Sequence, residues 1–141
     1  GDPAVYPSMR SNETNIVVAV DTSGSIDQEE IQEFISEIDA IKSQVRASVT
    51  LLTCDMKLNY GCPWRFEAWD AFQFDVEIRG GGGTNFKPVF EWVDEQDRAP
   101  DLLVYFTDAE GIFPDVEPNY PVNWLVKGKA TVQFGVRIQL N

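Results

Sequence analysis

The stretch Ile16-Val17-Val18-Ala19-Val20, followed by Asp21-Thr22-Ser23-Gly24-Ser25, decides the fold of this 141-residue chain. A continuous apolar run rich in β-branched residues predicts a strand that is buried on both faces, as strands are in the middle of a parallel sheet. The small and polar residues that follow predict a turn where this strand ends.

A helix is expected directly after that turn. Its apolar residues recur at spacings of three and four, as one face of a helix requires, and they are Ile31, Phe34, Ile35, Ile38, Ile41 and Val45. Asp27 is a suitable N-cap, and Glu30 stands three residues later, as in a capping box. Ile26 and Ile31 occupy the positions of a hydrophobic staple. Strand, turn and capped helix form the first half of a β-α-β unit.

The remainder of the chain continues this alternation of strands and helices. Further strands are expected at 48–54, 72–78, 102–106, 122–126 and 131–138, and a second helix from about residue 86. The strand at 72–78 is predicted from the alternation of Phe72, Phe74, Val76 and Ile78, in an aromatic-rich, hairpin-like stretch that covers the core or a sheet edge. The last two strands are separated by the turn Lys127-Gly128-Lys129.

The predicted order is β-α-β-β-α-β-β-β, which indicates an α/β fold of the Rossmann-like type. Its central sheet is expected to be mostly parallel, with an antiparallel edge strand and helices on both faces. This domain is expected to span residues 15–141, after an N-terminal segment of residues 1–14. Open sheets of this kind bind ligands outside the carboxyl ends of the strands, at the switch in strand order.

The composition excludes several classes of function. Eleven basic and 23 acidic residues give a net charge of −12, which argues against a nucleic-acid partner, because phosphate binding requires a basic surface. No apolar run approaches the roughly 20 residues of a membrane span, so a membrane partner is not expected. The chain has no histidine, so it cannot form a Ser-His-Asp triad or an HExxH zinc site.

The two cysteines bear on the cellular compartment of the protein, and the first residues bear on whether it is part of a longer chain. Cys54 and Cys62 lack CxxC spacing, and we interpret them as reduced thiols of a cytoplasmic protein, although a disulfide between them is possible. The start Gly1-Asp2-Pro3 has no initiator Met and predicts a domain taken from a longer protein.

Three segments place oxygen-bearing side chains at the expected ligand edge of the sheet. Asp21, Ser23 and Ser25 follow the first strand, Thr84 follows the glycine run 80–83, and Asp108 follows the strand at 102–106. Two carboxylates and three hydroxyls form a hard-oxygen set, which suits Mg2+ or Mn2+ and suits zinc or copper poorly. Each of these residues alone could be an ordinary turn residue, but together they predict one divalent-cation site.

The same segments resemble a known family. Asp21-Thr22-Ser23-Gly24-Ser25 matches the DxSxS signature of the metal-ion-dependent adhesion site in von Willebrand factor A (VWA) domains. Gly82-Gly83-Thr84 resembles the threonine loop of that family, and Thr107-Asp108 resembles its second aspartate. The stretch 105–114, with Tyr120-Pro121 and Trp124, is most similar to the bacterial VWA-like domain that lies C-terminal to a metallopeptidase-like region.

This resemblance implies a module without catalytic activity of its own that binds Mg2+, or Mn2+ or Ca2+, and a partner protein. It implies hydroxyl ligands from Ser23, Ser25 and Thr84, and carboxylates of Asp21 and Asp108 that bind directly or through water. Asp55 ends the second strand at the same edge and is either a turn residue or an indirect support of the ligands. An acidic group of the partner would bind the metal, and an AAA-type ATPase is implied as that partner.

The sequence departs from the ordinary VWA pattern at one point near the site. Ala109 stands where a glycine is common after the second aspartate, and the segment that follows resembles a loop where a helix is usual. The rim of the site is therefore expected to differ from that of ordinary VWA domains.

Two other functions remain open at this stage. One is a Mg2+-dependent phosphohydrolase with Asp21 as nucleophile, although Ser23 stands where such enzymes carry their second aspartate. The other is a structural domain of a larger metallopeptidase-like protein, with an empty site.

Overall fold

The computed structural model describes residues 14–23, 26–75 and 83–140. Its six-stranded sheet has the order β3-β2-β1-β4-β5-β6, and only the β2–β3 pair is antiparallel. The strands are β1 (Thr14–Asp21), β2 (Ala47–Cys54), β3 (Trp64–Phe66), β4 (Leu102–Thr107), β5 (Val122–Val126) and β6 (Val136–Gln139), and the helices are α2 (Gln28–Val45) and α3 (Lys87–Asp94). The mostly parallel sheet with one antiparallel edge strand confirms the predicted α/β, Rossmann-like class.

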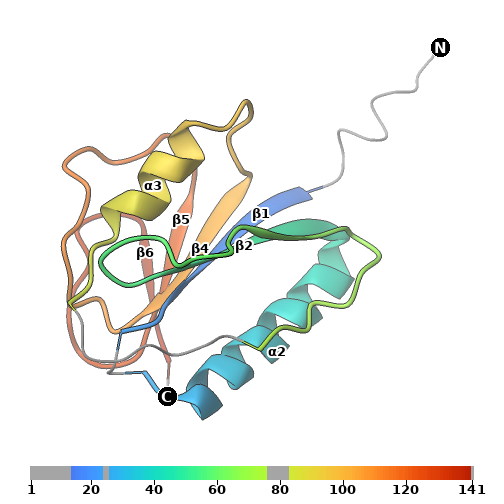
Figure 1. Ribbon diagram of the computed structural model, residues 1–141, viewed down its shortest axis with the longest axis horizontal. Coiled ribbons are helices and arrows are strands. Elements are labelled where there is room, and N and C mark those ends of the chain that lie inside the picture. The colour runs from blue at the N-terminus through green and yellow to red at the C-terminus, as the bar shows by residue number, and fades with distance from the viewer. Residues whose placement is uncertain (1–13, 24–25, 76–82, 141) are drawn as a thin grey trace.

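β1 lies in the middle of the sheet, between β2 and β4 (Figure 1). Val18, Ala19 and Val20 have no solvent exposure, which confirms that the apolar run is covered on both faces. The strand order reverses at β1, since β2 lies on one side of it and β4 on the other. The carboxyl ends of β1 and β4 are therefore adjacent, as ligand sites in such sheets require.

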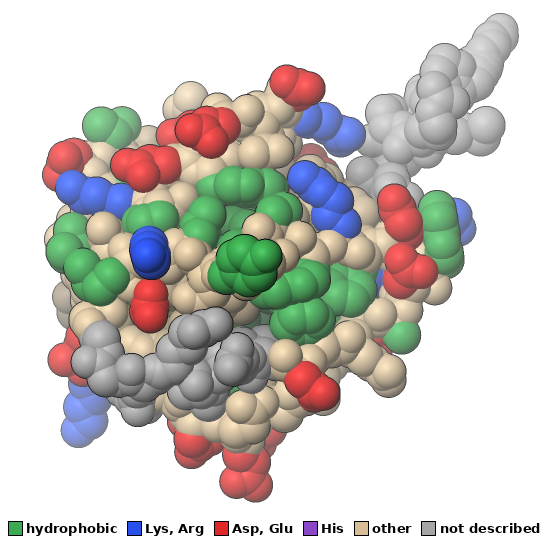
Figure 2. Space-filling model, viewed as in Figure 1, with side chains coloured by type: hydrophobic (Ala, Val, Ile, Leu, Met, Phe, Trp, Pro, Cys, Tyr) green, Lys and Arg blue, Asp and Glu red, His purple; other side chains and the backbone are tan. Residues whose placement is uncertain are grey.

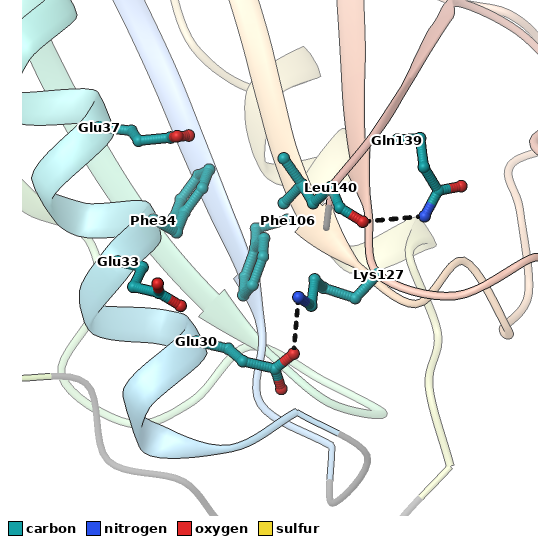
Figure 3. Close-up of a pocket in the computed structure, with 8 residues that line it drawn as sticks. All are labelled: Glu30, Glu33, Phe34, Glu37, Phe106, Lys127, Gln139 and Leu140. Carbon is teal, nitrogen blue, oxygen red and sulfur yellow. Dashed lines mark hydrogen bonds and ion pairs between the residues drawn. The ribbon is translucent and has the colours of Figure 1, made fainter.

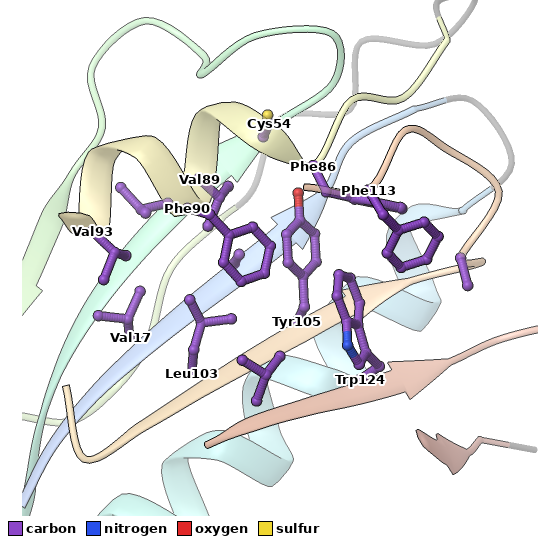
Figure 4. Close-up of a cluster of buried hydrophobic side chains, with 14 of the residues drawn as sticks. Val17, Cys54, Phe86, Val89, Phe90, Val93, Leu103, Tyr105, Phe113 and Trp124 are labelled. Atoms are coloured by element: carbon purple, nitrogen blue, oxygen red, sulfur yellow. The ribbon is translucent and has the colours of Figure 1, made fainter. Parts of the chain in front are cut away.

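The two helices cover opposite faces of the sheet (Figure 1). On one face, the apolar side of α2 packs against alternate residues of β1, β2 and β4. On the other face, α3 packs against the intervening residues in a cluster rich in aromatic rings (Figure 4). This arrangement confirms the prediction of helices on both faces. Within the described ranges, no helix combines the length and apolar character needed to cross a membrane.

The start of α2 has the predicted cap. The Asp27 carboxylate accepts a hydrogen bond from the Glu30 backbone N–H at 2.8 Å, and the Glu30 carboxylate accepts one from the Asp27 N–H at 3.1 Å. Ile26 and Ile31 are both buried in the core beneath this end of the helix. The sequence therefore located the first turn of α2 correctly, because capping depends on residues close in the chain.

The far end of α2 departs from the prediction. Ile41 and Val45 are 45% and 48% exposed, whereas Lys42 is buried. The Lys42 ammonium donates hydrogen bonds to the carbonyls of Ala68 and Asp70, so its charge lies against backbone oxygens. The predicted apolar stripe was wrong at its last turns, because the loop after β3, rather than the sheet, lies beside this part of the helix.

The antiparallel edge strand is β3, at Trp64–Phe66, and the strand predicted at 72–78 was wrong for its described part. Residues 71–75 have no regular secondary structure, and residues 76–78 lie outside the described residues. Phe72 and Phe74 nevertheless pack on the sheet side, since the Phe66–Phe72 and Trp64–Phe74 ring centroids lie 4.8 and 4.6 Å apart. These aromatics cover the sheet edge, as predicted, without forming a strand.

On the face of the molecule that is turned toward the viewer in Figures 1 and 2, hydrophobic side chains gather in the middle, over the connection between β2 and α3. Tyr60 and Trp69 in this connection are 96% and 75% exposed. They differ in this respect from Phe72, which is buried. The aromatic residues of the connection thus divide into edge cover and solvent-facing side chains.

The last predicted strand, 131–138, begins only at Val136, and β6 runs parallel to β5 rather than back along it. Residues 127–135 therefore cross over without a helix. Gly135 adopts a φ of +79°, and a Cβ at this position would lie 2.6 Å from the Val122 carbonyl oxygen, so glycine is required at this turn. Arg137 donates to the carbonyls of Gly128 and Ala130 and closes the crossover.

Candidate metal centre

Asp21, the last residue of β1, lies fully buried at the carboxyl edge of the sheet. One of its carboxylate oxygens accepts a hydrogen bond from the Ser23 N–H at 2.9 Å, and the other accepts one from the Thr107 hydroxyl at 2.6 Å. The first bond folds the chain into a turn after β1, and the second joins β1 to the neighbouring strand β4. The carboxylate is therefore held in one orientation.

The Thr84 loop is held by both flanking strand ends. The Asn85 N–H donates to the Asp55 carbonyl at 2.9 Å, which fixes the loop to the end of β2. The Ile112 N–H donates to the Thr84 carbonyl at 3.1 Å, which fixes it to the segment after β4. Thr84 is 7% exposed. These bonds place the threonine at the same edge of the sheet as Asp21.

Asp108 follows β4 directly and is half-buried. Its carboxylate accepts a hydrogen bond from the Glu110 N–H at 3.0 Å. Ala109 has a φ of +65°, a left-handed conformation that glycine adopts more easily, and its N–H donates to the Thr107 hydroxyl at 3.0 Å. Thr107 thus links the turn after β4 to Asp21.

The electrostatics of this edge favour a cation. Burial raises the pKa of Asp21 above its usual value, the charge of Asp108 raises it further, and hydrogen bonds from Thr107 and Ser23 oppose this shift. A cation beside Asp21 would offset both the lost hydration and the repulsion between the two carboxylates.

The Ser23 side chain is a second, independent indication of a cation at this edge. Its hydroxyl is buried and has no hydrogen-bond partner among the described residues, although it lies near enough to Asp21 to stabilise the charged carboxylate. A buried hydroxyl without a partner is rare in folded proteins and calls for an explanation such as an ion. The hydroxyl and carboxylate oxygens present at this edge fit a hard divalent cation such as Mg2+.

Four of the residues predicted from the sequence, Asp21, Ser23, Thr84 and Asp108, lie at the carboxyl edge of the sheet. Ser25 and the glycines 80–82 lie outside the described residues. The Asp55 carboxylate accepts from the Lys57 N–H at 3.4 Å, as in a turn, and its carbonyl anchors the Thr84 loop. Any part of Asp55 in metal binding stays a prediction.

Acidic residues alone would not form this site. Among residues 14–23, 26–75 and 83–140, no group of three or more His, Cys, Asp or Glu side chains is arranged to hold a metal ion. A cation at this edge would depend on hydroxyl ligands in addition to the two carboxylates.

Two supporting residues were missed in the sequence. Thr107 donates to Asp21, and Asn59 donates to the hydroxyls of Thr22 and Thr53 at 2.9 and 3.1 Å, which ties the loop after β2 to the turn after β1. Thr107 could have been found from its position beside Asp108 at a strand end. Asn59 carries no sequence signal, because its partners are brought to it only by the folded sheet.

Gly111 also supports the Thr84 loop, because it lets two chain segments approach closely. A Cβ at this position would lie 2.9 Å from the Thr84 carbonyl oxygen and 2.9 Å from Cζ of Phe86. We expect Gly111→Ala to lower the free energy of unfolding by about 1–3 kcal/mol in urea titration, since neither the loop backbone nor the buried ring can move freely. Gly83→Ala is a suitable control, since a Cβ there would meet only the flexible, exposed side chain of Met56 and no backbone atom. A Gly111→Ala protein as stable as the wild type would show that the approach is not tight.

The two cysteines are free thiols, Cys54 buried and Cys62 half-buried. Burial, the largest cause, raises the pKa of Cys54 to about 12. The Cys54 thiol donates to the Asn85 carbonyl at 3.4 Å, beneath the Thr84 loop. It therefore acts as a packed, protonated side chain.

The comparisons with known proteins agree with this architecture. The family model described as a VWA-like domain (DUF2201) matches residues 16–141. A protein of Thermotoga maritima described as uncharacterized is 32% identical over 99 residues, which cover 70% of this chain and 24% of that protein. The chain thus corresponds to a minor part of the length of this relative. With β1, the Thr84 loop and the end of β4 arranged as described, and the family model matched from Ile16 onward, the chain belongs to the VWA-like domain family.

Proposed function

We propose that this domain is a metal-dependent protein-interaction module. Asp21, Ser23, Ser25, Thr84 and Asp108 would hold one Mg2+, or Mn2+ or Ca2+, at the carboxyl edge of the sheet. When bound, the metal would offer a coordination position to an acidic side chain of a partner. The observation that carries this proposal is the buried, unpartnered hydroxyl of Ser23 beside the buried Asp21 carboxylate.

The chain's own residues would prepare this site before a partner arrives. Thr107 and the Ser23 N–H fix the direction of the Asp21 carboxylate, and the backbone bonds at Asp55 and Ile112 fix the Thr84 loop. Little ordering would then be needed on binding, which favours affinity. The carboxylate of a partner would otherwise be repelled by a chain of net charge −12, so its remaining surface should be neutral or basic.

The hydrolase alternative is less well supported. Both oxygens of Asp21 accept hydrogen bonds and the side chain is fully buried, which does not suit a nucleophile that must attack a phosphate in line. The sequence contains no histidine to act as a general base. We expect the wild-type domain to show no turnover of p-nitrophenyl phosphate with Mg2+ or Mn2+. Turnover by the wild type that is lost in Asp21→Asn would favour the hydrolase instead.

Partner capture tests the interaction directly. Immobilised wild-type domain should retain its partner from cell extract in Mg2+, release it in EDTA, and retain it again when Mg2+ is restored. Asp21→Ala and Thr84→Ala should capture nothing in any of these buffers, whereas Asp97→Ala, which removes an exposed carboxylate elsewhere, should behave as wild type. We propose an AAA-type ATPase as the first partner to test in purified form. Capture that is indifferent to EDTA and to both substitutions would contradict the proposed function.

A further inference from the structure

A groove with an acidic wall lies on the α2 face of the sheet, and none of the residues proposed to hold the metal line it. It encloses about 360 Å3 between the first half of α2 and the ends of β4 and β6 (Figure 3). Glu30, Glu33 and Glu37 line it from the helix, and Phe106 and Leu140 line it from the sheet side. The groove therefore combines carboxylates on one wall with apolar residues on its floor.

The floor of the groove continues as an exposed apolar strip over β5 and β6. Phe34 of α2 stacks on Phe106 of β4, with ring centroids 4.6 Å apart, and closes the inner side. Leu125 is half-buried and packs against this core, and Ile138 is its register partner on β6. Ile138 is 38% exposed and Val136, two residues earlier on the same face, is 57% exposed.

The two flanks of α2 are covered differently. On the β3 side, Lys42 and Asp39 hold the loop after β3, since the Asp39 carboxylate accepts a hydrogen bond from the Phe72 N–H at 2.7 Å. On the β6 side, the strip formed by Leu125, Val136 and Ile138 is half-buried to exposed. Neighbouring strands lie about 4.8 Å apart, so a helix of roughly 10 Å diameter covers about two of them. The surface of β5 and β6 together therefore has the width of one helix.

The charges of the helix wall indicate what such a helix would carry. Glu30 forms an ion pair with Lys127 at 3.1 Å, which closes the end of the groove nearest the carboxyl edge. Glu33 and Glu37 are exposed, lie one turn apart on the same side of α2, and form no ion pair within the described residues. A lysine or arginine pair spaced one turn apart on a neighbouring helix would be complementary to them.

We propose that this groove and strip bind an amphipathic helix of a partner protein, with its apolar side on Leu125, Val136 and Ile138 and its basic flank against Glu33 and Glu37. This second surface lies on the α2 face, whereas the proposed metal lies at the carboxyl edge. Binding here does not require the metal, so the two sites can be tested separately.

The probe is a synthetic peptide of about 15 residues, long enough to form a helix on a surface, with leucines at helical spacing and lysines along one flank. In calorimetry it should bind the domain equally well in Mg2+ and in EDTA. A peptide with glutamates in place of the lysines should bind at least tenfold more weakly. In NMR titration, the amide shifts should be confined to α2, β5 and β6.

Two matched variants distinguish this groove from general attraction to an acidic protein. Glu33→Lys/Glu37→Lys should weaken binding of the lysine peptide at least tenfold, whereas Glu91→Lys/Glu95→Lys, which changes the net charge equally on α3, should not. Ile138→Asp should weaken binding with thermal unfolding unchanged. Equal losses in both charge-reversed variants, or shifts scattered over the surface, would overturn the proposal. Self-association abolished by Ile138→Asp, without peptide binding, would identify a second copy as the occupant and overturn it too.

Discussion

Asp21→Ala should weaken Mg2+ or Mn2+ binding at least tenfold in isothermal calorimetry. The substitution removes a formal charge and a proposed ligand oxygen at once. It also leaves the Ser23 N–H and the Thr107 hydroxyl without the carboxylate that orients the turn after β1. The loss should therefore exceed that caused by Thr84→Ala, which removes a single proposed hydroxyl ligand.

Asp97→Ala is the matched control for this experiment. It removes the same charge from an exposed position near the end of α3, so general electrostatic attraction of cations changes equally. We expect its metal affinity to stay within about twofold of the wild type, since exposed distant charges are largely screened. Equal affinity in Asp21→Ala and wild type would end the assignment of this site.

Trp124→Ala should lower the free energy of unfolding by about 3–5 kcal/mol in urea titration. Trp124 is fully buried on β5, and its ring centroid lies 5.0 Å from that of Tyr105 and 5.1 Å from that of Phe86 (Figure 4). Phe86 follows the Thr84 loop and packs in the same cluster. The cavity left by the indole should therefore also loosen the loop that carries Thr84.

Trp69→Ala serves as the control for loss of an indole side chain. Trp69 is 75% exposed, so its removal should change stability by less than about 0.5 kcal/mol. A tenfold change in the unfolding constant corresponds to about 1.4 kcal/mol. If the free energy of unfolding of Trp124→Ala differs from that of the wild type by less than about 1 kcal/mol, the aromatic cluster repacks around the lost indole. In that case the Thr84 loop would not depend on it.

The features that were predicted correctly from sequence depend on residues close together in the chain. The apolar run at Ile16–Val20 and the Asp27 cap each specify a local structure, and both are present. Ile41 and Val45 were placed wrongly, because helical periodicity does not indicate where the sheet beneath a helix ends. The last strand was predicted to begin at residue 131, and it begins only at Val136, because a crossover that contains Gly135 brings the chain back parallel to β5.

The common position of the candidate site residues could be predicted for the same reason, while their part in metal binding stays a prediction. Asp21, Thr84 and Asp108 each follow or precede an element that the sequence delimits, so a parallel sheet brings them to one edge. The bond between Thr107 and Asp21 joins residues 86 apart in the chain, and no local pattern indicates it. The buried state of the Ser23 hydroxyl likewise follows only from the packed turn.

Crystals grown with Mn2+ test most directly whether one divalent cation binds at the carboxyl edge of the sheet, as we propose. Anomalous difference maps should contain a single strong peak within coordination distance of the Ser23 and Thr84 hydroxyls, lost in crystals of Asp21→Ala and kept in those of Asp97→Ala. No peak at this edge, at Mn2+ concentrations where calorimetry records binding, or a peak only elsewhere on the molecule, would contradict the account.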